Sequence, residues 1–184
     1  MLNSLDTPPF FTPDEISGLR ELGLWHESHT TPAKLAYAGL ILSPIMQLVM
    51  ADNATTTAEF EAVSRFVTTM ERSFELATRS DIENIGTDMG LLPMLKSTWD
   101  NPRFLAARRI LGGTLPRLSE ADAHDVRTEI SKAILSVARA GSSHMISLHM
   151  LDKSERGVIN ELVRDLHLEK CAEGLSLMDK AGDN

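Results

Sequence analysis

Basic residues are scarce in this chain. It has 18 Lys and Arg against 26 Asp and Glu among 184 residues, which gives a net charge of −8 at pH 7. Nucleic acids and anionic membrane surfaces are bound by clusters of Lys and Arg. The charge balance therefore argues against both as partners.

Cysteine and long hydrophobic runs are scarce as well. Cys171 is the only cysteine, which excludes an intramolecular disulfide and fits a reducing compartment. The N-terminus lacks the basic start and apolar core of a signal peptide. The longest apolar stretch, Leu35 to Met50, contains Gly39 and Pro44 and is shorter than the ~20 residues of a membrane span. We expect a cytoplasmic protein in which this stretch is a buried helix.

Aromatic residues make up only 5% of a chain that is 42% hydrophobic and contains nine methionines. This composition predicts an aliphatic core between helices. The alternation of polar and apolar residues that is typical of strands is absent, except for a weak pattern near 145–150. An all-α protein with short loops is the expected class.

Helix-start motifs occur along the whole chain. Two of them, Thr12-Pro-Asp-Glu15 and Thr56-x-x-Glu59, have the spacing of a capping box. Asp152-x-x-Glu155 has the same spacing, and Ser119 opens a further helix. The pair Gly112-Gly113 predicts the end of a helix that reaches Leu111.

We therefore predict a single globular bundle of about seven to nine helices, built from two pseudo-repeated helical hairpins. The expected parts are an N-terminal extension with a short helix (1–31), a first hairpin (32–78), connecting short helices (79–118), a second hairpin (119–168) and a C-terminal helix (169–184).

The turn of the first hairpin carries a family resemblance. Ala51-Asp52-Asn53, followed by Thr56 and Glu59, resembles the TerB-like (tellurite-resistance protein B-like) superfamily. There an alanine-rich helix runs into Ala-Asp-Gly before a Ser or Thr and a Glu open the next helix. Asn53 replaces the usual glycine, and asparagine tolerates the left-handed conformation better than most residues.

The second hairpin is similar to the branch of that superfamily with an expanded second turn. The segments 137–141 (Val-Ala-Arg-Ala-Gly) and 151–155 (Leu-Asp-Lys-Ser-Glu) match the two ends of the expanded turn, and Leu115-Pro116 fits the preceding region. The middle of the turn, 142–150, lacks the glycines of the branch. The resemblance implies a duplicated helical domain of bacterial type with a stress-related role.

Acidic residues at the two turns are candidates for a cation site. The resemblance implies that Asp52, Glu59, Asp152 and Glu155 hold a divalent cation, and carboxylate oxygens suit Ca²⁺ or Mg²⁺. Glu59 and Glu155 are equally explained as capping-box residues, which need no metal. Both interpretations stay open at this point.

Histidines offer a catalytic alternative. His144 and His149 lie in the expanded turn, and the spacing from Gly141 to His149 is similar to that of the alkylhydroperoxidase D-like family. Ser142 and Met145 occupy the positions of that family's Cys-x-x-Cys pair, so the thiolate nucleophile is missing. An enzyme would then use His144 or His149 as a general base.

Other side chains have structural explanations. Cys171 lies on a predicted helix and is expected to pack as a small hydrophobe. His26 and His29 provide only two candidate ligands, whereas a zinc site needs three or four N or S ligands. Trp25 and Trp99 fall in loop-like segments and are the candidate anchors for a partner.

Taken together, these patterns predict a non-enzymatic TerB-like module that binds a divalent cation and a partner protein or small ligand. A homo-oligomer is a further expectation, and the histidine enzyme is the alternative.

Overall fold

The computed structural model describes residues 10–27, 31–51, 56–74, 91–141 and 153–182. These residues form eight α-helices and two short 3₁₀ helices, with no strand among them. The all-α class and the expected helix number are confirmed. The elements are α1 (Pro13–Glu21), α2 (Pro32–Val49), α3 (Thr57–Phe74), α5 (Leu91–Thr98), α6 (Asn101–Thr114), η2 (Leu115–Arg117), α7 (Glu120–Gly141), α8 (Lys153–Leu166), η4 (Leu168–Lys170) and α9 (Ala172–Gly182).

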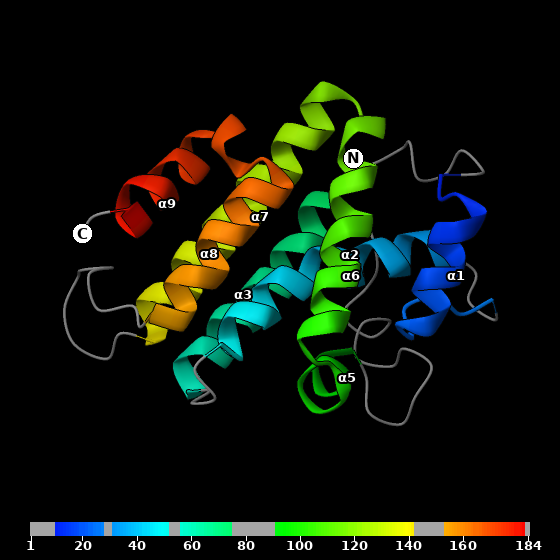
Figure 1. Cartoon of the computed structure of the whole chain (residues 1–184), viewed down its shortest axis with the longest axis horizontal. Coiled ribbons are helices and arrows are strands. Elements are labelled where there is room, and N and C mark those ends of the chain that lie inside the picture. Colours follow the sequence, from blue (N-terminus) through cyan, green and yellow to red (C-terminus); the bar gives the residue numbers. More distant parts are fainter. Residues whose placement is uncertain (1–9, 28–30, 52–55, 75–90, 142–152, 183–184) are drawn as a thin grey trace.

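Helix α2 lies at the centre of the bundle. Every residue from Leu35 to Val49 is buried, and α3, α5, α6, α7 and α8 all pack against it. Figure 1 shows α2 running through the middle of the molecule with α6 crossing in front of it, while α1 and α9 lie near opposite ends of the long axis. Among the described helices, α2 alone is long and apolar enough to cross a membrane, but 83% of its 18-residue window is buried inside the protein. The prediction of a buried core helix is confirmed.

Pro44 lies inside α2 without ending it. A proline cannot donate to the carbonyl four residues earlier, which here belongs to Leu40. The Ser43 hydroxyl donates to that same oxygen at 2.9 Å. The buried carbonyl therefore keeps a hydrogen-bond partner, and the helix continues to Val49.

The helices of the two predicted hairpins pack across one another. Helix α3 packs against α7, α8 packs against α2, and α2 packs against α7. The second helix of each hairpin thus contacts the first helix of the other. The end of α2, the start of α3, the end of α7 and the start of α8 all lie at one end of the molecule, hereafter the turn end (Figure 1).

Helix α6 continues through Gly112 and Gly113 to Thr114, so the prediction that these glycines end the helix at Leu111 is wrong. A Cβ atom on Gly112 would lie 3.0 Å from the backbone oxygen of Asp165 on α8. The missing side chain at Gly112 therefore allows α6 and α8 to approach closely.

The C-terminal part of the fold depends on a second close approach. After α8 the chain turns through His167, whose φ of 52° is left-handed. A Cβ atom on Gly174 in α9 would lie 1.8 Å from the backbone oxygen of Leu168. Only glycine fits between α9 and η4 at this point. Gly157 in α8, by contrast, has nothing within 4 Å of the position that its Cβ would take.

These two glycines provide a matched test of the packing. We expect Gly174→Ala to lower the free energy of unfolding by about 2–3 kcal/mol, because the added methyl group must displace backbone. Gly157→Ala should raise it by about 0.5–1 kcal/mol, since alanine stabilises an open helix position. Urea unfolding followed by circular dichroism measures both. Equal stability of Gly174→Ala and the wild type would contradict the close contact between α9 and η4.

Candidate functional site: the groove between α3 and α7

A groove of about 510 Å³ lies between α3 and α7. The lining residues of α3 are Ala58, Glu61 and Arg65, and those of α7 are Lys132, Leu135, Ser136, Arg139 and Ala140. Ala58 belongs to the first turn of α3 and Ala140 to the last turn of α7. The groove therefore begins at the turn end, where both predicted turns join the bundle.

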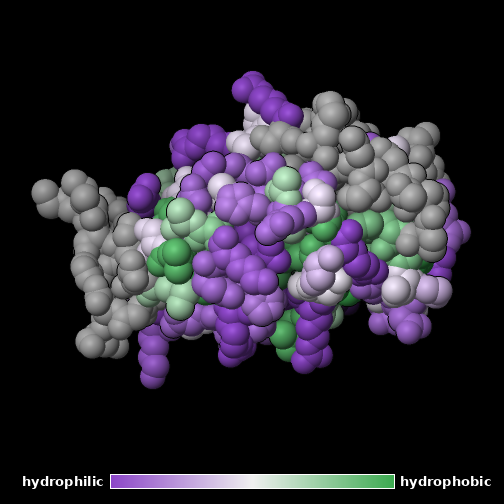
Figure 2. Space-filling view, turned by 90° about the horizontal axis from the view of Figure 1, so that it is seen from above, coloured by the Kyte–Doolittle hydropathy of each residue, from purple (hydrophilic) through white to green (hydrophobic). Residues whose placement is uncertain are grey.

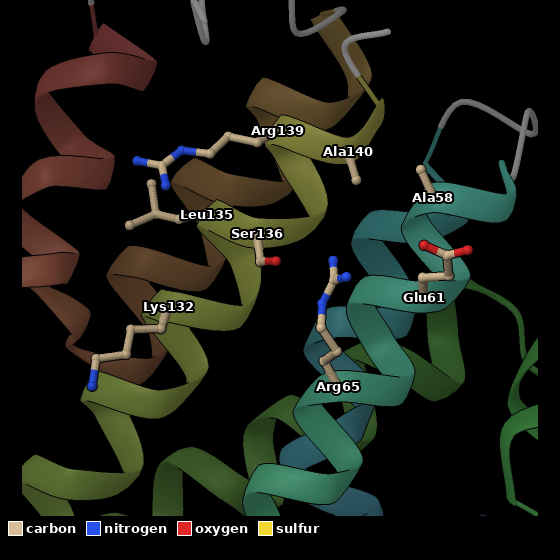
Figure 3. Close-up of a pocket in the computed structure, with 8 residues that line it drawn as sticks. All are labelled: Ala58, Glu61, Arg65, Lys132, Leu135, Ser136, Arg139 and Ala140. Atoms are coloured by element: carbon tan, nitrogen blue, oxygen red, sulfur yellow. The ribbon is translucent and has the colours of Figure 1, made fainter.

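The two helices run antiparallel along the groove. Figure 3 shows Ala58 facing Ala140 near the turn end, and Arg65 reaching from α3 into the gap toward Ser136 on α7. Lys132 and Arg139 extend from α7 on the side away from α3. Small side chains therefore line the gap, and Arg65 is the labelled cation that reaches into it.

The groove is lined by three cations and one carboxylate, Arg65, Lys132, Arg139 and Glu61, in a chain of net charge −8. Lys132 and Arg139 both have partners within the protein. Lys132 is bound to Glu129 at 2.8 Å, and this hydrogen bond raises the pKa of its ammonium group. Arg65 forms no side-chain hydrogen bond or ion pair with any residue that the structure describes. Its guanidinium is available to an anionic group.

A second groove, of about 620 Å³, lies between α6 and α8. Arg108 is 4% exposed there, and its guanidinium lies 2.9 Å from Glu161 and 3.1 Å from Asp165. Arg127 adds a hydrogen bond of 3.1 Å from Nε to the backbone oxygen of Leu166. The central cation of this groove is already paired within the protein. Arg108 thereby links α6 to α8.

Glu59 is a capping-box residue in the structure. Its carboxylate accepts hydrogen bonds from the Thr56 backbone N–H at 2.7 Å and from the Thr56 hydroxyl at 2.8 Å. The Glu59 N–H donates back to the Thr56 hydroxyl at 3.2 Å, and the Glu59 residue is 2% exposed. The capping interpretation is thereby confirmed for Glu59.

The remaining residues of the predicted cation site are only partly described. Glu155 is buried in the first turn of α8, whereas Asp52 and Asp152 lie outside the described residues. No group of three or more His, Cys, Asp or Glu side chains suited to a metal occurs in the part of the chain that the structure describes. The four-carboxylate site stays a prediction.

The histidine alternative falls on residues that the structure leaves out. His144, His149 and His29 all lie outside the described residues. The ring of His26 lies 2.9 Å from the backbone oxygen of Gly23. His26 therefore has a local structural partner.

Cys171 is buried, as predicted. Its thiol donates to the backbone oxygen of Leu168 at 3.2 Å and lies 3.5 Å from the Ser131 hydroxyl. A thiol enclosed in this way packs α9 and η4 against α7 and is shielded from reagents.

Neither tryptophan is an exposed anchor, so that prediction is wrong. Trp99 is 5% exposed and packs against Phe104 at 5.2 Å between ring centroids. Trp25 is partly buried and packs edge-on against Phe11. Tertiary packing covers both loop-like segments because large aromatic rings supply much of the apolar area of a core.

Exposed apolar surface is limited in the described part of the chain. The large exposed hydrophobic side chains are Leu175 and Met178, both on α9. Figure 2 shows one face of the molecule, where hydrophobic patches are small and separated by hydrophilic surface.

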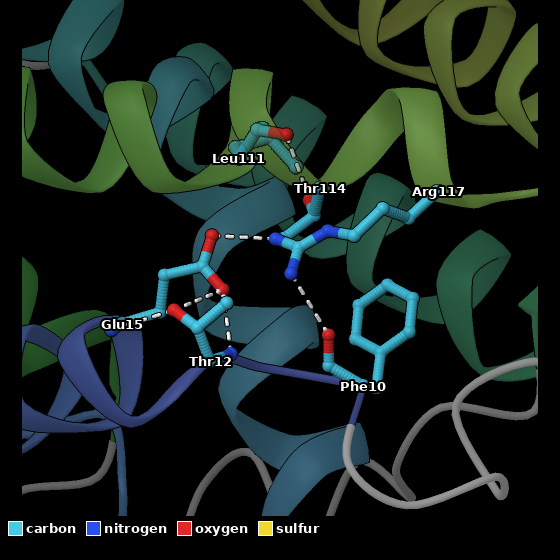
Figure 4. Close-up of polar contacts among 6 residues, drawn as sticks. All are labelled: Phe10, Thr12, Glu15, Leu111, Thr114 and Arg117. Carbon is cyan, nitrogen blue, oxygen red and sulfur yellow. Dashed lines mark hydrogen bonds and ion pairs between the residues drawn. The ribbon is translucent and has the colours of Figure 1, made fainter.

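A third polar cluster attaches the N-terminal segment to η2. Arg117 donates to the backbone oxygen of Phe10 at 3.0 Å and to the carboxylate of Glu15 at 2.5 Å. Figure 4 shows Glu15 also closing the capping box with Thr12 at the start of α1. Burial raises the pKa of Glu15, but the hydrogen bonds and charge of Arg117 and the Thr12 N–H outweigh burial, so that the pKa is lowered overall. All these groups are satisfied within the protein.

The residues of the groove were not singled out from the sequence. Arg65, Lys132 and Arg139 lie on the polar faces of amphipathic helices, where a charged side chain is ordinarily just solvated. The seven-residue spacing of Lys132 and Arg139 puts both on one face of a helix, but nothing in the sequence indicates that α3 lies beside it.

Comparisons of this chain with protein-family models, with curated proteins and with solved structures found no match. The TerB-like resemblance is accordingly supported by the motifs of the two turns alone.

The cap at Glu59 can be separated from a cation site by experiment. We expect Glu59→Ala to lower the free energy of unfolding by about 1 kcal/mol, because the N-terminus of α3 loses its cap. The loss should be the same in EDTA, Ca²⁺ and Mg²⁺, as measured by urea unfolding. If the four carboxylates bind a cation, Ca²⁺ or Mg²⁺ will instead raise the midpoint of thermal unfolding of the wild type, and Glu59→Ala will abolish that rise.

The lowered pKa of Glu15 predicts a pH dependence of stability. The ionised carboxylate stabilises the folded state above the ordinary carboxyl pKa of about 4.3, and this contribution is lost as the pH falls through the lower pKa of the folded state. Glu15→Gln should therefore be less stable than the wild type at pH 7 by about 1 kcal/mol, and the difference should shrink below pH 4. Urea unfolding at several pH values tests this, and a difference that is constant between pH 7 and pH 3 would contradict it.

Proposed function

We propose that this chain is a non-enzymatic TerB-like helical module that binds a partner protein through the groove between α3 and α7. The observation that carries the proposal is Arg65. It reaches into a groove at the turn end and has no partner of its own among the described residues. An exposed guanidinium with no partner among the described residues can bind an external anionic group.

The lining of the groove supports binding rather than catalysis. Its described residues include one carboxylate and one hydroxyl, Glu61 and Ser136, and neither histidine nor cysteine. General acid–base catalysis and nucleophilic catalysis both need a pair of positioned groups. A groove of small side chains bordered by cations is instead suited to hold a segment of another molecule.

The position of the groove agrees with the family resemblance. The resemblance identifies the two turns as the distinctive part of the domain, and the groove runs from the helix ends that adjoin them. A divalent cation held by Asp52, Glu59, Asp152 and Glu155 would belong to the same end of the molecule. We extend the proposal to a cytoplasmic location, in keeping with the single cysteine.

Site-specific photo-crosslinking in the native cells tests this function. Ser136, inside the groove, is replaced by benzoylphenylalanine, and crosslinked proteins are identified by mass spectrometry. We expect one discrete partner, and we expect its crosslink to fall severalfold when Arg65→Glu is added, because a cation at the centre of the contact is then reversed.

The matched control carries benzoylphenylalanine at Arg109, an exposed position of α6 in the other groove. Its crosslinks should differ from those at position 136. The same products from both positions, or none above background at position 136, would contradict a binding groove between α3 and α7. A crosslink to a second copy of this chain would make the partner a homo-oligomer.

A further inference from the structure

We infer that the partner in the groove is a second copy of this chain, and that the two copies meet through antiparallel contact of their α3 helices about a twofold axis. This inference rests on the proposed function and names the partner of the same groove. It follows from the charges of α3, from the small side chains beside them and from the symmetry of an antiparallel contact.

Two opposite charges lie one helical turn apart on the outer face of α3. Glu61 and Arg65 are both exposed and both line the groove, and their spacing of four residues corresponds to about 6 Å along the helix. Neither side chain forms a hydrogen bond or an ion pair with a residue that the structure describes. The groove therefore offers one cation and one carboxylate to another molecule.

An antiparallel contact between two α3 helices pairs these charges reciprocally. A twofold interface uses the same surface of each copy, so that a contact from residue i to residue j is repeated from j to i. With the axis between the two charges, Glu61 of each copy faces Arg65 of the other. Guanidinium groups bind carboxylates through paired, directional hydrogen bonds. One register of α3 thus provides partners for all four charges.

The neighbouring residues allow the second helix to approach. Ala58 and Thr68 lie three residues before and three residues after the charged pair, on the same helix face, and in this register Ala58 of one copy lies opposite Thr68 of the other. The Thr68 hydroxyl donates to the backbone oxygen of Ser64 at 3.2 Å, so its burial leaves no donor unpaired. On the α7 wall, Ser136 and Ala140 are small as well (Figure 3), which favours close packing of a helix beside α3.

The charge of the contact favours a second copy over other partners. Each chain carries a net charge of −8, and such a charge keeps molecules apart unless the surfaces that meet are locally complementary. The stripe of α3 in the contact has one carboxylate and one guanidinium, and hence no net charge. A nucleic acid or an anionic membrane would need several cations at this surface, and Glu61 would repel both.

Sedimentation velocity of the full-length protein, at concentrations up to about 100 µM, tests the inference. We expect the wild type to form dimers. Glu61→Arg and Arg65→Glu should each weaken the dimer about tenfold or more, because either change places like charges opposite each other at two positions. The two variants change the net charge in opposite directions, so a loss that both share cannot come from net charge.

Two combinations of these variants should restore the dimer. In an equimolar mixture of Glu61→Arg and Arg65→Glu, two arginines of one chain face two glutamates of the other, so heterodimers should form with an affinity close to that of the wild type. The double variant Glu61→Arg/Arg65→Glu exchanges the charges within one chain and should recover the homodimer. Circular dichroism and the midpoint of thermal unfolding verify that each variant is folded.

Two further variants are matched controls. Arg109→Glu makes the same change in net charge as Arg65→Glu, but on α6 in the other groove, and should leave the dissociation constant of the dimer within about twofold. Leu175→Ser removes one of the exposed apolar side chains of α9 and should likewise leave the dimer intact, since α9 takes no part in the contact.

The outcomes separate this inference from the proposed function. A wild type that stays monomeric, a dimer that both charge variants leave intact, or a mixture of the two that forms no heterodimer would each overturn the inference. A dimer that only Leu175→Ser disrupts would do the same, because its contact would lie on α9. The crosslink at position 136 then decides the proposed function separately: a different protein captured there keeps the groove as a binding site, whereas no specific product means that the proposed function fails too.

Discussion

The burial of α2 is the constraint on which the rest of the structure depends. An 18-residue helix with an uninterrupted buried stretch from Leu35 to Val49 cannot be covered by one neighbour, and five other helices pack against it. The hydrophobic effect provides the gain, since each large apolar side chain contributes about 1.5–3 kcal/mol on full burial. Burial also requires that the backbone polar groups of α2 keep hydrogen-bond partners. The Ser43 hydroxyl is the partner of the Leu40 carbonyl, to which Pro44 cannot donate.

Covering α2 also determines where polar residues gather. The surrounding helices turn their apolar faces toward α2, so that their charged faces meet one another in outer grooves. In the groove between α6 and α8, Arg108 is paired with Glu161 and Asp165 and fastens α8. In the groove between α3 and α7, the central Arg65 has no partner in the described part of the chain. One groove consequently links helices of the fold, while the other is the one in which we propose that a partner binds.

Local and distant interactions differ in how far the sequence predicts them. The capping boxes at Glu15 and Glu59 join residues three positions apart, so the helix starts are predictable from short motifs. Gly112 carries a helix-ending signal, yet α6 continues through it because α8 approaches at that point. Trp99 resembles a loop residue in sequence, but it is buried against Phe104. At Gly112 a distant element outweighs the local preference, and at Trp99 packing against the neighbouring helix does so.

The sequence by itself determined the all-α class, the burial of α2 and the helix starts at Thr12 and Thr56, because each depends on composition or on residues within one or two helical turns. Only the tertiary structure decided which grooves form and that Arg65 has no side-chain partner among the described residues. Arg65 and Ser136 are far apart in the chain and face each other only because α3 and α7 both pack against α2. The candidate site is thus a product of helix packing around one buried helix, and no spacing along the chain indicates it.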